Sequence, residues 1–180
     1  MTPDEQAHKL DLLRAEGLPV APNELERLTA LRASGLLERP EDPVLDELVA
    51  KLAQALAVEM VTLTLIDLEK QWIKSAFNMT DRQNSRQHSF CQYTVLGEHV
   101  LEVENTLEDP RFRHNIFVIA EPKIRFYAGA PLVTDQGYAL GSLCVFDRAP
   151  RRLKDDERLE LEAYRDAAAV QLGMRRGRKK

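Results

Sequence analysis

Apolar residues recur at the spacing of an amphipathic helix in three segments of the chain. The first is residues 24–36, which follow a capping-box pair formed by Asn23 and Glu26. The second begins where Asp42 precedes a proline, and its apolar stripe consists of Leu45, Leu48, Val49, Leu52, Ala53 and Leu56. The third, residues 155–174, has acidic residues in its first turn, as the helix dipole favours. We expect the second helix to cover a sheet.

Alternating and β-branched residues predict strands in two hairpins. The first hairpin joins residues 60–66 to residues 71–77 through a polar turn. The second joins residues 125–132 to residues 141–147, and Gly137 between them supplies the positive φ of a short loop. Because strands and helices do not alternate regularly, the pattern predicts the α+β class.

The strand over residues 125–132 has two chemically different faces. Ile124, Phe126, Ala128, Ala130 and Leu132 give one face that is plainly core. The opposite face carries the guanidinium of Arg125, the phenol of Tyr127 and Gly129. Polar groups beside a sheet need partners or a ligand. This face therefore predicts a pocket.

Residues 78–123 are less regular than the rest of the chain. A short helix is expected after Ser89, a strand over residues 99–103 and turns over residues 105–115. A long excursion of this kind in a compact domain is usually functional.

Five sequence motifs together resemble the GAF domain family of small-molecule sensor modules. They are RFYAGAPL (125–132), GSLCVFD (141–147), SRQHSFC (85–91), EDPRFRHN (108–115) and DRAPRRL (147–153). The chain looks most like the GAF subgroup of bacterial sensor kinases and cyclic-dinucleotide enzymes, over roughly residues 24–172. The resemblance implies an antiparallel sheet of about six strands, with helices packed on one face and a loop-covered ligand pocket on the other. It does not specify the ligand.

We predict that the pocket is bounded by residues 89–93, by residues 105–112 and by the strand that carries Arg125 and Tyr127. The predicted ligand-binding residues are Trp72, Ser89, Phe90, Cys91, Asn105, Asp109, Phe112, Arg125 and Tyr127. For the two aromatic residues Trp72 and Tyr127, cavity wall and ordinary core are both open interpretations.

Four arginines, Arg86, Arg111, Arg113 and Arg125, come from segments that the family fold brings toward one side of the sheet. Arginine suits planar or phosphate groups, so a cyclic nucleotide or another anion is one interpretation. In the other, Arg125 pairs with Asp109 or Asp147 and Arg111 pairs with a neighbouring acid to brace the loops.

The two cysteines carry two interpretations. Ser89 and Gln92 have capping-box spacing, which places Cys91 in the first turn of a short helix, where a thiolate is stabilised. Alternatively, Cys91 is a buried small hydrophobe, and Cys144 is expected to be one as well.

A metal site with His88 lacks a closed ligand set, and a reducing compartment disfavours a disulfide. No catalytic motif appears, so we expect neither an enzyme nor a cofactor.

Charge divides the chain unevenly. Residues 175–180 contribute five positive charges to a net charge of −4, so the remaining residues carry −9. We expect an N-terminal extension over residues 1–22 with a short helix, a GAF-like domain over residues 23–174 and a basic tail. The tail is either a solvated terminus or a weak nucleic-acid contact, and the acidic body argues against nucleic acid. Without an export signal or a long apolar run, we expect a cytoplasmic protein that does not bind membranes. The natural-looking start and tail favour a complete protein over a fragment of a larger sensor.

The leading functional hypothesis is a non-catalytic sensor that binds an unidentified small molecule and acts through a homodimer or a signalling partner. Its terminal helices are expected to pair with copies of themselves. One alternative is a thiol-based redox enzyme or peroxide sensor that uses Cys91. Another is a ligand-free dimerisation module whose pocket is filled by its own side chains.

Overall fold

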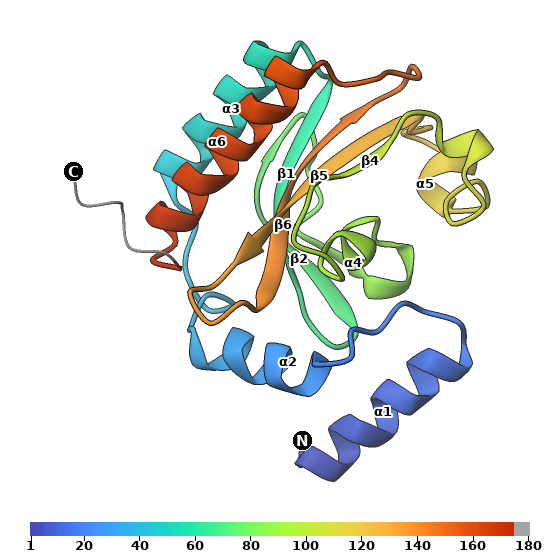
Figure 1. Ribbon diagram of the computed structural model, residues 1–180, viewed down its shortest axis with the longest axis vertical. Coiled ribbons are helices and arrows are strands. Elements are labelled where there is room, and N and C mark those ends of the chain that lie inside the picture. The colour runs from blue at the N-terminus through green and yellow to red at the C-terminus, as the bar shows by residue number, and fades with distance from the viewer. Residues whose placement is uncertain (175–180) are drawn as a thin grey trace.

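A six-stranded antiparallel sheet forms the centre of the computed structural model (Figure 1). Its strand order is β3–β2–β1–β6–β5–β4. The strands are β1 (Met60–Ile66), β2 (Lys70–Phe77), β3 (Gln83–Ser85), β4 (Leu101–Val103), β5 (Phe126–Val133) and β6 (Ala139–Asp147). The structure describes residues 1–174, and the basic tail of residues 175–180 lies outside the described residues.

Both expected hairpins are confirmed by the strand pairing. Strand β1 pairs with β2, and their register shifts between Leu63 and Thr64. Strand β5 pairs with β6 and places Gly129 opposite Cys144. Gly137 in the connecting loop has a φ of +89°, the left-handed conformation that the loop needs.

One face of the sheet is covered by two long helices that lie side by side, α3 (Pro43–Leu56) and α6 (Asp155–Gln171) (Figure 1). Asp42 caps α3, because its carboxylate accepts a hydrogen bond of 2.9 Å from the amide of Val44. The expected apolar stripe of α3 packs against aliphatic residues of β1, β5 and β6, including Leu63, Ala130 and Leu143. This face is the main hydrophobic core.

Two helices precede the sheet in sequence, α1 (Pro3–Ala15) and α2 (Glu24–Ala33). Leu10 of α1 is buried in a small cluster with Leu28 and Leu68, so this extension packs on the rest of the molecule. The expected capping box at Asn23 is wrong. Asn23 has φ −102° and ψ 30°, which is not the extended backbone of an N-cap, and its side chain makes no capping bond.

Short elements cover the other face of the sheet. They are the 3-10 turns η1 (Arg86–His88) and η2 (Thr106–Glu108) and the helices α4 (Cys91–Thr94) and α5 (Ile116–Ile119). The expected short helix after Ser89 is α4, which contacts β1, β5 and β6. From residue 1 to residue 174, no helix has the length and apolar character that spanning a bilayer requires.

Candidate functional site

The space between α4 and the sheet is filled by aromatic side chains of the protein itself. Phe90 stacks on Phe112 with ring centroids 4.6 Å apart, and on Tyr127 at 5.2 Å. Phe146 lies 5.3 Å from Tyr127 on the same face. Three of the predicted ligand-binding residues, Phe90, Phe112 and Tyr127, are therefore brought together, and they pack against each other.

A polar cluster lies beneath these rings. The hydroxyl of Tyr127 is 2.5 Å from that of Thr94 and 3.2 Å from the sulfur of Cys144. Ser142 Oγ lies 2.9 Å from the same sulfur. Gly129 makes room for the phenol, since a Cβ there would lie 2.2 Å from Tyr127 Oη. The phenol, the hydroxyls of Thr94 and Ser142 and the Cys144 thiol are thus linked to one another, whereas Thr62 Oγ1 on the same face has no partner among the described residues.

The two cysteines meet in this cluster, with their sulfurs 2.9 Å apart. Both thiols are free and buried. Burial raises the pKa of Cys91, but hydrogen bonds from the surrounding thiol and hydroxyl groups lower it, with a net fall to about 6. Burial and the neighbouring Cys91 raise the pKa of Cys144 well above its ordinary value. The pair therefore gives up one proton far more readily than two.

Trp72 lies on the opposite face of the sheet from Tyr127. It is paired with Leu65 on β1 and packs against the core under α3 and α6. A pocket between α4 and the sheet would not include it. Its indole Nε1 is buried without a hydrogen-bond partner among the described residues.

The other predicted site residues mostly hold the covering loops in place. Ser89 donates to Gln71 Oε1 at 2.5 Å and accepts from the amide of Gln92 at 3.3 Å. Asn105 caps η2 by accepting from the amide of Leu107 at 3.1 Å. Their role as ligand contacts stays a prediction.

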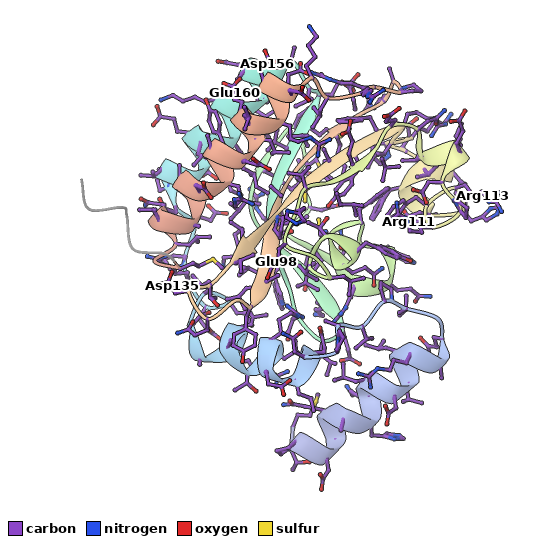
Figure 2. The ribbon with its side chains drawn as sticks, in the orientation of Figure 1. Glu98, Arg111, Arg113, Asp135, Asp156 and Glu160 are labelled. Atoms are coloured by element: carbon purple, nitrogen blue, oxygen red, sulfur yellow. The ribbon has the colours of Figure 1, made fainter. Side chains whose placement is uncertain are left out.

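The four candidate arginines separate into different environments. Arg125 donates to the carbonyls of Val118 at 2.9 Å and Ile124 at 3.1 Å, so the expected pairing of its side chain with an acid is wrong. Backbone carbonyls of α5 and of the preceding residue thus hold its Nη1 atom instead. Arg111 forms the expected pair with a neighbouring acid, at 3.0 and 2.7 Å from Asp109. Figure 2 shows Arg111 and Arg113 on the loop beside α5, on the side of the molecule away from α3 and α6.

Arg86 is a member of a buried charge network that the sequence did not reveal. Its Nη1 lies 2.6 Å from Glu24 Oε1, and Arg27 holds the same carboxylate through bonds of 2.9 and 2.7 Å. All three side chains are 1% exposed. Arg86 also donates to the carbonyls of Asp67 and Pro19. Burial raises the pKa of Glu24, but the two arginines lower it to a net value below the ordinary 4.5.

A groove of about 390 Å³ lies on the outer side of α4, between η1 and α5. It is lined by Leu18, Gln87, His88, Gln92, Tyr93, Arg111, His114, Asn115, Ile116 and Ile119. Arg111 pairs with Asp109 through its Nε and Nη2 atoms and leaves Nη1 without a partner within residues 1–174. The side-chain carbonyl of Gln92 is buried and receives no hydrogen bond from a described residue. Within residues 1–174, no acidic side chain lines the groove.

Sequence reasoning missed most of this groove and all of Glu24 and Arg27. The i, i+3 spacing of Glu24 and Arg27 is a detectable signal, but it is equally typical of an exposed pair on a helix. His88, Gln92 and His114 carry no motif that marks them as neighbours.

The GAF domain model matches residues 40–172. The chain belongs to the GAF domain family.

The relatives of this GAF domain include signalling proteins. It is 42% identical over 133 residues to a cyclic di-GMP phosphodiesterase of Pseudomonas aeruginosa. The match covers 74% of the chain and 23% of that relative, so the chain spans about a quarter of the length of the protein it matches.

Solved structures share the fold at low sequence identity. A free methionine-R-sulfoxide reductase from Thermoplasma acidophilum has a TM-score of 0.59 at 12% identity, covering 72% of this chain and 90% of its own. The GAF domain of a phosphoenolpyruvate-protein phosphotransferase from Coxiella burnetii has a TM-score of 0.57 at 17% identity, covering 83% and 90%. These likenesses support the α+β fold and carry no function.

Proposed function

We propose that this GAF domain is a regulatory domain of bacterial signalling that binds a small anionic molecule in the groove outside α4. The observation that carries the proposal is the set of donor groups that line the groove. Arg111, although paired with Asp109, offers a free Nη1 group, His88 and His114 add imidazoles, and no carboxylate of the described residues lines the walls. A guanidinium and imidazoles that converge on one concavity favour an anion.

The unpaired side-chain carbonyl of Gln92 favours a ligand that also carries a hydrogen-bond donor. An enclosed acceptor without a donor costs about 1–3 kcal/mol. A ligand with an N–H or O–H group would relieve this cost when the Gln92 side chain turns toward the groove. We therefore expect a ligand that combines an anionic group with a hydrogen-bond donor, a combination that nucleotides have.

The groove is placed to report its occupancy to the N-terminal helices. Gln87 and His88 line it, and they share the η1 turn with Arg86, which holds Glu24 at the start of α2. Leu18, from the segment between α1 and α2, is also a lining residue. A ligand that shifts η1 would therefore move the start of α2, and we propose that the output passes to a partner through these helices.

The test is to incubate the protein with a small-molecule extract of bacterial cells and to record its mass under native and denaturing conditions. We expect a non-covalent adduct that disappears on denaturation. Arg111→Gln should weaken its binding at least about tenfold, which corresponds to about 1.4 kcal/mol. Arg113→Gln is the matched control, because Arg113 is exposed two residues away and does not line the groove. Absence of any adduct, or equal loss in both variants, would contradict the proposal.

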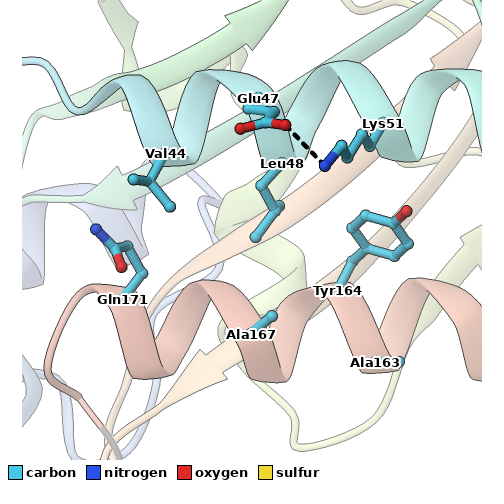
Figure 3. A pocket seen from close by; sticks show the side chains of 8 residues that line it. All are labelled: Val44, Glu47, Leu48, Lys51, Ala163, Tyr164, Ala167 and Gln171. Atoms are coloured by element: carbon cyan, nitrogen blue, oxygen red, sulfur yellow. Dashed lines mark ion pairs between the residues drawn. The ribbon is translucent and has the colours of Figure 1, made fainter.

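A second candidate function, homodimerisation, is favoured by a groove of about 390 Å³ between α3 and α6. Figure 3 shows Leu48 of α3 and Tyr164 of α6 pointing into the space between the helices, with the Glu47–Lys51 ion pair at its rim. Val44, which lines this groove, is 52% exposed although it is apolar. We propose that a second copy of the chain covers the groove.

Analytical ultracentrifugation over a wide concentration range tests the dimer. Ala167→Arg, in the wall of the groove, should convert a dimer to a monomer. Leu107→Arg, an exposed apolar residue on the other face of the sheet, should leave the dimer intact. A wild-type protein that sediments only as a monomer would exclude this function.

A further inference from the structure

We propose that Cys91 and Cys144 form a reversible dithiol–disulfide site that a hydroperoxide oxidises. The two residues are 53 positions apart in sequence, and the fold brings their sulfurs to 2.9 Å. Cys91 begins α4, and Cys144 lies in the central strand β6. The site goes beyond the proposed ligand binding and does not depend on it.

The geometry leaves little movement between the reduced and the oxidised state. A disulfide bond is about 2.0 Å long, so the sulfurs must approach by roughly 1 Å. One of them belongs to a helix of only four residues, which can adjust more easily than a strand in the centre of a sheet. Disulfide formation therefore does not require rearrangement of the core under α3 and α6.

The surroundings of the two sulfurs are polar, which distinguishes them from cysteines that serve only as packing. Ser142 Oγ and Tyr127 Oη lie 2.9 and 3.2 Å from Cys144 Sγ. These hydroxyls hydrogen-bond Cys144, whose thiol lies 2.9 Å from Cys91 Sγ and can donate its proton to a Cys91 thiolate, the nucleophilic form of cysteine. A pKa of Cys91 lowered to about 6 is consistent with Cys91 as the attacking residue.

Access for a small oxidant lies through α4. Gln92 and Tyr93 line the outer groove, while Cys91 in the same short helix faces the sheet. A single helical turn thus separates the groove from the sulfur. Transient opening of so short an element needs less free energy than global unfolding.

The reaction balances with a hydroperoxide as the oxidant. The Cys91 thiolate attacks one peroxide oxygen, an S–O bond forms, the O–O bond breaks, and the leaving oxygen takes up a proton as an alcohol or water. Cys144 Sγ then attacks Cys91 Sγ, the S–S bond forms, the S–O bond breaks, and hydroxide leaves with the Cys144 proton as water. Two thiols lose two electrons, and the peroxide gains them.

The experiment treats the reduced full chain with one equivalent of hydrogen peroxide and measures its intact mass and its free thiols after denaturation. We expect a mass lower by two hydrogen atoms and a fall from the two thiols of the sequence to none, both reversed by dithiothreitol. A cross-link that closes a loop of this length should raise Tm by roughly 5–15 °C. The same treatment in guanidinium chloride shows whether the reaction needs the fold.

Variants of one cysteine at a time test which cysteine attacks the peroxide and which one then forms the disulfide with it. In Cys144→Ser, Cys91 should gain one oxygen and become trappable by dimedone. In Cys91→Ser, Cys144 should keep its thiol under the same treatment. Circular dichroism checks that each variant is folded, and Cys144→Ala replaces Cys144→Ser if the latter is not. Two intact thiols in the oxidant-treated folded protein, or a disulfide found only between chains on a non-reducing gel, would overturn the proposal.

Discussion

The two faces of the sheet are built from different chemistry. Under α3 and α6, the buried residues that the sheet contributes are mainly aliphatic or aromatic and include Leu63, Phe126 and Leu143. Ser75 of β2 is a buried polar residue there and donates to Asp46 of α3 at 2.5 Å. Under α4, the sheet contributes Tyr127 and Cys144 together with the hydroxyl groups that pair with them. Adjacent residues of one strand, Leu143 and Cys144, belong to the two different faces.

The two faces therefore differ in what they contribute: one mainly stabilises the fold, and the other makes specific polar contacts. Long helices over mainly aliphatic side chains bury apolar area with few polar groups to satisfy. Short helices over a polar cluster bury groups that are tolerated only while each has a partner. A ligand or an oxidant can therefore change contacts on the face under α4 without unfolding the domain.

The largest contrast between the faces is expected from Leu143→Ala and Cys144→Ala. Leu143→Ala should lower the free energy of unfolding by about 3–5 kcal/mol, because it opens a cavity in a fully packed aliphatic core. Cys144→Ala should cost about 1 kcal/mol, since Tyr127 keeps its bond to Thr94. Urea unfolding measures both values, and similar values would contradict the distinction between the faces.

A somewhat smaller effect on stability is expected from the buried charge network at the start of α2. Glu24→Gln should cost about 3 kcal/mol at pH 7, because Arg27 and Arg86 lose their buried counter-charge. The pKa of Glu24 is lowered in the folded state. Its contribution to the free energy of unfolding is therefore fully present above a pH of 4.5, the ordinary pKa of the group. This contribution is lost as the pH falls through the lowered pKa of Glu24 in the folded protein.

Urea unfolding at pH 7, 5 and 4 checks this dependence. The difference between wild type and Glu24→Gln should be full at pH 7 and should shrink once the pH falls below 4.5. Glu26→Gln, on the exposed side of the same helix, is the control and should change stability little at any pH. A difference that grows toward acid pH would argue against the network.

Gly129→Ala tests how tightly the α4 face is packed. A new Cβ would lie 2.2 Å from Tyr127 Oη and 2.7 Å from Thr94 Oγ1, so the phenol must move. We expect a loss of about 1–3 kcal/mol by thermal unfolding. Removing the hydroxyl with Tyr127→Phe should recover part of this loss, and a strictly additive double variant would show that the two groups do not meet.

The smallest effect is expected at the surface of the α4 face. Asp109→Asn breaks an ion pair with Arg111, whose side chain is 41% exposed, so unfolding should change by less than about 1 kcal/mol. The substitution also frees the guanidinium for a ligand. We expect equal or tighter binding of the anion in the native-mass experiment, and weaker binding would mean that the pair holds the groove in shape.

Much of the fold was predictable because its signals are local. The stripe of α3, the alternation in β1 and the turn at Gly137 depend on residues only a few positions apart. The GAF motifs identified the family, and the matching family model confirms it. The candidate site was predictable only in part: Phe90, Phe112 and Tyr127 do meet.

The remaining site depends on contacts that periodicity does not encode. For Trp72, cavity wall and ordinary core were both open, because the face that a strand residue occupies follows from its register with its neighbours. Arg86 and Glu24 are 62 positions apart, and neither carries a signal that it is buried. Such pairing becomes visible only when η1 and α2 are packed together.

The sequence by itself determined the class of fold, its two main hairpins, its long helices and its family, because hydrophobic period and turn chemistry act over a few residues. Only the tertiary structure decided that the aromatic face is filled by its own side chains and that the two sulfurs lie 2.9 Å apart. It also decided that the groove lined by Arg111, His88 and His114 lies outside α4. The physical reason is that burial and pairing of polar groups depend on which distant segments share a face, and packing of the whole chain sets that.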